Sequence, residues 1–173
     1  MTMLPEIEQR YSCRSYRDQP IEPEKLTRVL EAARLAPSAR NFQEWRFIVV
    51  TDPDLRQQMV DVCKGQAFVG QAPAIVVACG VNTQHVMSCG QRSTPIDVAI
   101  ALEHVALQAT REGLATCWIG AFLQDQAKAL LGVPDDAEVV ECMPIGYPAD
   151  ARRPKTRVGL DEIVYRNRWG QGM

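Results

Sequence analysis

Three side chains at alternate positions near the N-terminus have the chemistry to bind an anion. Arg10, Ser12 and Arg14 are two residues apart, and alternate side chains of an extended segment point the same way. Two planar guanidinium groups with a hydroxyl between them supply the charge and the donors that a phosphate group requires. The pattern predicts a phosphate site. The simpler interpretation is a solvated basic stretch.

The same pattern occurs close to the other end of the chain. Lys155 and Arg157 flank Thr156, so an extended segment would place both cations on one side. We predict that the folded chain brings the two clusters together around a single phosphate. Solvated surface charge is again the alternative interpretation.

Composition limits the classes of protein to which the chain can belong. Its 173 residues, 46% of them hydrophobic, predict a single domain over residues 1–173 with a well-formed core. A net charge of −2 argues against a nucleic-acid partner. There is no run of 18 apolar residues and no secretory pattern. We therefore expect a cytoplasmic protein that does not associate with a membrane and keeps its thiols reduced.

Cysteine and histidine spacing gives little support for metal or hydrolytic chemistry. None of the six cysteines forms a CxxC pair, and Cys79 and Cys117 lie in apolar runs typical of a core. A metal site from Cys79, His85 and Cys89 matches no common spacing. His104 is best interpreted as a hydrogen-bonded surface residue, and neither histidine has the context of a catalytic triad. We predict no metal and no catalytic side chain.

Hydrophobic patterning predicts a mixture of helices and strands. The apolar run over 74–79 is expected to be a central strand buried on both faces. The strands do not alternate strictly with helices, which favours an α+β fold over a doubly wound one. The predicted helices cover 23–35, 53–64 and 124–131, and the other predicted strands cover 46–50, 116–120 and 139–145.

A further helix, unusually apolar, is predicted to begin near residue 94. Thr94 would be its N-cap, Pro95 its first residue and Asp97 an acid in its first turn. It would end at about Glu112, before Gly113. Its apolar side chains cover most of the circumference, which predicts burial in the core or at a subunit interface. The polar segment 82–94 before it is expected to be a mobile loop or short lid.

The loop over 36–45 carries several uncommitted polar groups. Asn41 and Gln43 are two apart, and their amides can pair with the polar edge of a flat heterocycle. The alternative is an ordinary turn capped by Ser38 and Asn41. No GxGxxG, P-loop or GxSxG motif is present, so the sequence predicts no Rossmann-type dinucleotide site.

Taken together, these motifs resemble those of the nitroreductase-like flavoproteins over nearly the whole chain. The family's RxSxR, APSxxNxQPW, GLGxxWIG, GYP, KxR and NRW segments have counterparts in the same order. These are RYSCR (10–14), APSARNFQEW (36–45), GLATCWIG (113–120), IGYP (145–148), KTR (155–157) and RNRW (166–169). The chain departs from the pattern at Glu44, where proline is frequent, at Ala115, where glycine is frequent, and in its short 82–94 segment.

The resemblance implies an α+β fold with a mixed, mostly antiparallel sheet, assembled as an intertwined homodimer with FMN at its interface. The apolar helix would form the dimer core, and the segment 160–173 would wrap around the partner. By the match, the RxSxR and KxR groups would hold the flavin phosphate, and a backbone N–H of the 119–120 segment would lie near flavin N5. The implied cofactor-binding residues are Arg10, Tyr11, Ser12, Arg14, Pro37, Ser38, Asn41, Gln43, Ile119, Gly120, Lys155 and Arg157, with some of the loop residues reaching the site of the other subunit.

The resemblance also implies a reaction. NADH or NADPH would deliver hydride to flavin N5, and a nitroaromatic, a quinone or a similar flat acceptor would then take it in a ping-pong sequence. Three alternatives stay open. The first is another flavin reaction on the same fold, such as dehalogenation, flavin fragmentation or dehydrogenation. The second is a flavin-binding protein without catalysis, and the third is a phosphate-ligand module without flavin.

Overall fold

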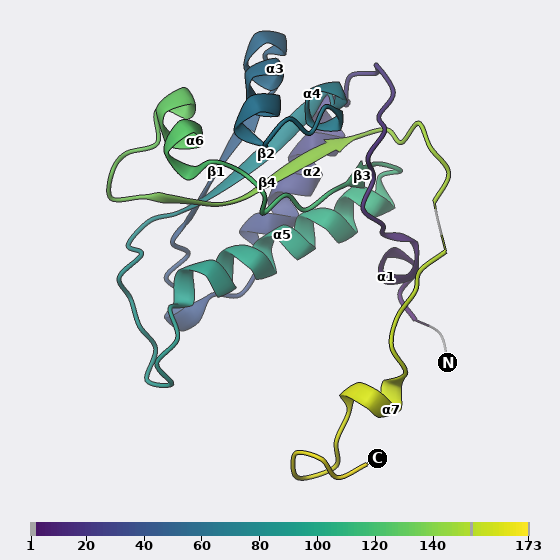
Figure 1. Ribbon diagram of the computed structural model, residues 1–173, viewed down its shortest axis with the longest axis vertical. Helices are drawn as coiled ribbons and strands as arrows, with labels where there is room; N and C mark the ends of the chain where they lie inside the picture. The colour runs from purple at the N-terminus through teal and green to yellow at the C-terminus, as the bar shows by residue number, and fades with distance from the viewer. Residues whose placement is uncertain (1–2, 153, 173) are drawn as a thin grey trace.

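A four-stranded antiparallel sheet forms the centre of the molecule (Figure 1). The computed structural model describes residues 3–152 and 154–172. Within these ranges the strand order is β1-β2-β4-β3, with every neighbouring pair antiparallel. The strands are β1 (Trp45–Val50), β2 (Ala74–Gly80), β3 (Ala115–Thr116) and β4 (Glu138–Gly146). The predicted α+β class is confirmed, with strands mostly where the hydrophobic runs placed them.

Helices cover both faces of the sheet, so every residue of β2 is buried as predicted. On one face, α2 (Pro23–Arg34) and α5 (Ser93–Arg111) pack around Val76, Ala78 and Met143. On the other face, α3 (Pro53–Val62), the short α4 (Phe68–Gln71) and α6 (Gln124–Leu131) pack around Ile75 and Val77. The predicted helices over 23–35, 53–64 and 124–131 are confirmed to within about two residues.

The predicted N-terminus of the long apolar helix is wrong. α5 begins at Ser93, and its N-cap is Arg92, which makes no side-chain capping bond. Thr94 is instead buried against β2, so closely that a methyl group placed on Gly80 would overlap Thr94 Cγ2. Tertiary packing thus buries the Thr94 side chain, which the capping pattern had predicted to cap the helix. The predicted C-terminus is confirmed, because Gly113 follows with φ +78°.

The predicted strand over 116–120 is largely wrong, since β3 comprises only Ala115 and Thr116. Beyond Thr116, the pairing with β4 continues through the Cys117 N–H, which donates to Pro144 O, and through an isolated bridge between Ile119 and Cys142. Pro144 has no N–H to return, so the hydrogen-bond ladder is interrupted at this position.

The chain ends in an extended arm that leaves the body of the molecule (Figure 1). The arm contains the one-turn helix α7 (Leu160–Ile163), while α1 (Pro5–Gln9) lies at the other end of the chain, against α5. Large apolar side chains of the arm are open to solvent, with Trp169 90% exposed. Among the described residues, no helix has both the length and the apolar character needed to cross a bilayer.

Candidate functional site

Residues 12–17 lie beside segments from the second half of the chain. Ser12 forms a parallel bridge with Thr116, and the Cys13 N–H donates to Thr116 O over 3.0 Å. The next residues run antiparallel to the segment after β4. There Tyr16 bridges Pro148, and the Ala149 N–H donates to Ser15 O over 2.9 Å. These backbone bonds bring the segment containing Lys155 and Arg157 back to the N-terminal cluster.

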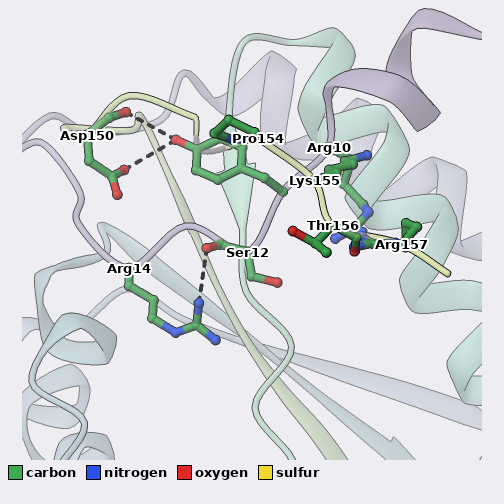
Figure 2. A pocket seen from close by; sticks show the side chains of 9 residues that line it. Arg10, Ser12, Arg14, Asp150, Pro154, Lys155, Thr156 and Arg157 are labelled. Carbon is green, nitrogen blue, oxygen red and sulfur yellow. Dashed lines mark hydrogen bonds between the residues drawn. The ribbon is translucent and has the colours of Figure 1, made fainter.

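The two basic clusters line one cavity, as the alternate spacing predicted (Figure 2). Its volume is about 270 Å³, several times the roughly 30 Å³ that one water molecule takes in the liquid. Cys13 points into the core and is fully buried, while Ser12 and Arg14 on either side of it are exposed. The residues that line the cavity are Arg10, Tyr11, Ser12, Arg14, Asp150, Pro154, Lys155, Thr156 and Arg157.

Most of the cationic groups in this cavity have donors that no carboxylate occupies. Lys155 Nζ donates to the carbonyl of Ile7 over 2.6 Å, and Arg14 Nη1 reaches only the carbonyl of Ser12, over 3.4 Å. Across 3–152 and 154–172, the recorded ion pairs include neither of these residues nor Arg157. Arg10 Nε lies 3.6 Å from a carboxylate oxygen of Glu103. The cavity therefore holds positive charge that an anion would compensate.

The pKa of Lys155 also reflects the excess of positive charge in the cavity. Burial lowers the pKa of Lys155, and the nearby charges of Arg10, Arg157 and Arg152 lower it further. An anion between these groups would oppose their mutual repulsion. Asp150, which no sequence pattern indicated, also lines the cavity, and its carboxylate accepts from the Tyr11 hydroxyl over 3.3 Å. Burial is the main reason that the pKa of Tyr11 is raised.

The loop before β1 lies outside this cavity. Ser38 Oγ accepts from the Gln43 N–H over 3.0 Å, and Gln43 Nε2 donates to Asn41 O over 3.1 Å. Both Asn41 (φ +60°) and Gln43 (φ +55°) adopt left-handed backbone conformations, which are uncommon for residues with a side chain. The Ala39 N–H donates to the Asp97 carboxylate and ties the loop to α5. Pro37, like Asn41 and Gln43, is exposed.

The predicted ring-contacting segment continues from the cavity along β4. Ile119 is buried and its N–H donates to Cys142 O over 2.9 Å, so that donor is already used. Gly120 is exposed, and no acceptor is recorded for its N–H within the described residues. A methyl group on Gly120 would meet only the Glu141 carboxylate, at 3.8 and 3.9 Å. Of these two residues, Gly120 rather than Ile119 has a backbone N–H with no recorded acceptor in the described part of the chain.

Glu141 is a second residue that the sequence analysis missed. Its Oε1 is inaccessible to solvent and has no hydrogen-bond partner, and burial raises the pKa of the carboxyl to about 7. The available signal was its position as the single acid in the otherwise apolar run 139–145. Over the described ranges, no group of three or more His, Cys, Asp or Glu side chains is arranged to hold a metal ion.

Comparison with known proteins identifies the family. The nitroreductase family model matches residues 7–147, and the chain belongs to that family. The match includes the RxSxR segment, the loop before β1 and Gly120. It ends before Lys155 and Arg157.

Known proteins resemble the chain in sequence, and a solved structure resembles it in fold. The chain is 30% identical to a putative NADH dehydrogenase/NAD(P)H nitroreductase of Methanothermobacter thermautotrophicus, covering 98% of this chain and 88% of the relative. It is 28% identical to an FMN reductase [NAD(P)H] of Bacillus subtilis, covering 88% and 68%. A nitroreductase family crystal structure from Clostridium difficile superposes with a TM-score of 0.84 at 32% identity, covering 97% and 99%.

Proposed function

We propose that this protein binds FMN and transfers hydride from NADH or NADPH to a flat acceptor such as a nitroaromatic or a quinone. It is an FMN-dependent NAD(P)H oxidoreductase of the nitroreductase family. The observation that carries the proposal is the cavity in which Arg14 meets Lys155 and Arg157, none of which has a recorded carboxylate partner within residues 3–152 and 154–172. The relatives named as NAD(P)H nitroreductase and FMN reductase supply the reaction class.

The cavity suits the phosphate end of FMN. Arg14 and Arg157 offer planar donors that can bind phosphate oxygens in pairs, and Lys155 adds a point charge. Ser12, beside Arg14, adds a hydroxyl donor. Asp150 bonds to Tyr11 rather than to any of these cations. The donors thus match a dianion that carries several acceptor oxygens.

The cofactor would lie along the segment from Thr116 to Gly120, with its phosphate near Thr116 and its ring near Gly120. Thr116 is held beside Ser12 at the cavity, and four residues of extended chain span roughly 13 Å. At the far end, the Gly120 N–H is available to donate to the ring, and glycine lets the backbone approach a flat surface closely. When bound, FMN would accept and return hydride at N5, while the chain supplies binding and orientation.

A homodimer would complete this site. Pro37, Ser38, Asn41 and Gln43 do not line the cavity of their own chain, and some of them would reach the ring or the ribityl chain of the partner's flavin. Exposed apolar side chains of the C-terminal arm, among them Leu160 and Trp169, would be buried against the second copy. Each of the two flavin sites of the dimer would hold donor and acceptor in turn, which gives ping-pong kinetics.

The test is a visible spectrum of the purified protein, with mass spectrometry of the molecule released by heat. We expect about one FMN per chain, followed by oxidation of NADH or NADPH that a quinone or a nitroaromatic accelerates above free FMN. Bound FMN without such turnover would indicate a flavin-binding protein without this activity. A colourless protein that takes up no added FMN would contradict the proposal.

A further inference from the structure

Glu141 lies directly behind the backbone that the proposed function sets beside the flavin ring. It is on β4, next to Cys142, whose carbonyl accepts from the Ile119 N–H. Its two carboxylate oxygens are 3.8 and 3.9 Å from the position of a methyl group on Gly120. The carboxyl is therefore in van der Waals range of Gly120, whose N–H has no recorded acceptor among the described residues.

No basic group of the described residues neutralises this carboxyl. Oε1 is fully shielded from water and lacks any hydrogen-bond partner. The titratable side chains close enough to feel its charge are the thiols of Cys63 after α3, Cys117 after β3 and Cys142 on β4. At the start of the strand, Glu138 and Arg92 pair with each other. Ala78, the residue of β2 that pairs with Glu141 on the neighbouring strand, carries no charge.

An unpaired carboxyl in such a place disfavours its own ionisation. Transfer of a charge out of water is unfavourable unless a partner compensates, and here burial raises the pKa of Glu141 to about 7, with the backbone of Ile119 opposing the rise. The carboxyl is thus poised between its neutral and its charged form near neutral pH. Any added negative charge nearby would favour the neutral form further.

We propose that Glu141 is a positioning residue that couples proton uptake to reduction of the cofactor bound at Gly120. The inference rests on the proposed function. The donor gives up two electrons as hydride, and both pass to the ring. The Glu141 carboxylate takes one proton from water, its O–H bond forms, and no electron passes through it. On reoxidation by the acceptor, that O–H bond breaks and the proton returns to water.

The test is the midpoint potential of the bound flavin, measured in the holoprotein from about pH 5 to about pH 9. Glu141→Gln mimics the neutral carboxyl at almost the same volume. Above neutral pH we expect the flavin of the unaltered protein to be harder to reduce than that of Glu141→Gln. The difference should be about tenfold in the equilibrium constant, or about 30 mV for two electrons. The two potentials should converge at the acidic end.

Two further variants serve as controls for the effect of Glu141→Gln on the flavin potential. Glu138→Gln removes the same charge from the same strand at a carboxylate already paired with Arg92, and should leave the pH dependence unchanged. Glu141→Asp keeps an ionisable group and should restore part of the pH dependence. An equal effect of Glu138→Gln, or the same potentials in all four proteins, would overturn the inference while leaving the proposed function intact.

Titration of Glu141 in the apoprotein tests the coupling separately from the proposed FMN-dependent function. In the apoprotein, infrared difference spectra should show one carboxyl titrating near pH 7 that is missing from Glu141→Gln. A Glu141 that titrates at the ordinary value near 4.5 would contradict the coupling. A protein that takes up no FMN would overturn the proposed function and the coupling with it, even if Glu141 titrates near neutral pH.

Discussion

Ser12 and Thr116 are neighbours in a parallel bridge, although 104 residues separate them in sequence. The Cys13 N–H strengthens this contact by donating to Thr116 O over 3.0 Å. Because Ser12 lines the basic cavity and Thr116 begins the segment that leads to Gly120, the bridge joins the predicted phosphate end of the site to the predicted ring end.

Arg14→Ala should weaken FMN binding. The change removes a charge-assisted contact worth roughly 1.5–3 kcal/mol, which corresponds to about 10- to 100-fold in Kd. Arg14→Lys should recover part of the affinity, because it keeps the charge and loses the planar fork. Lys128→Ala removes a positive charge on α6, away from the cavity, and should have little effect. Fluorescence titration of the apoprotein measures all three, and an unchanged Kd for Arg14→Ala would exclude Arg14 from the site.

Gly120→Ala should separate binding from folding. Gly120 does not have a positive φ, and an added methyl group would meet only ordinary contacts within the chain, so the melting temperature of the apoprotein should stay nearly the same. FMN should nevertheless bind more weakly, since a side chain at this position limits how closely the backbone can approach a flat ring. Gly132→Ala is the matched control with the opposite outcome. At φ +66° it should cost about 1 kcal/mol of stability and leave FMN affinity unchanged.

The meeting of the two basic clusters was predictable, because alternate spacing fixes which side chains share a side of an extended segment. The pattern at 10–14 survives in the structure as buried Cys13 between exposed Ser12 and Arg14. The placement of β2 was equally predictable from its continuous apolar run. In both cases a local regularity of the sequence carries the information.

Other features depend on tertiary contacts that no local pattern records. Thr94 was predicted to cap α5 but is buried against β2, and Pro144 on the neighbouring strand interrupts the ladder that would have lengthened β3. Asp150 is notable because it accepts from Tyr11, and Glu141 because it lies unpaired behind Gly120, so both depend on residues distant in sequence. Such contacts depend on how distant segments pack, which the spacing of residues in one segment does not determine.

Trp169→Ala should weaken the proposed dimer. This indole is 90% exposed in the single chain, and a buried aromatic anchor at an interface is commonly worth about 2 kcal/mol or more, or about 30-fold in the dissociation constant. Light scattering across a dilution series measures the change. Leu123→Ala, at a partly exposed apolar side chain of the folded body, is the control. If the unaltered protein stays monomeric at micromolar concentration, the proposed homodimer is contradicted.

Arg28→Ala should make the fold more sensitive to acid. Arg28 donates two hydrogen bonds to Glu112, at 2.8 and 2.7 Å, and these lower the pKa of that carboxyl from 4.5 to about 2. A lowered pKa adds stability above about pH 4.5 that is lost as the pH falls toward 2. Acid unfolding of Arg28→Ala, followed by circular dichroism, should therefore occur at a higher pH. An unchanged midpoint would show that the pair contributes nothing to acid stability.

Glu141→Gln should change stability in a different pH window and with the opposite sign. The pKa of Glu141 is raised from 4.5 to about 7 in the folded state, so between these values the unfolded chain has lost a proton that the folded chain retains. The stability contributed by this group is full below about pH 4.5 and falls until about pH 7. The glutamine variant avoids that loss, so its free energy of unfolding relative to the unaltered apoprotein should rise across this window and level off above it. Urea titrations at several pH values measure the difference, and a difference that does not vary with pH would mean that Glu141 titrates alike in the folded and unfolded chain.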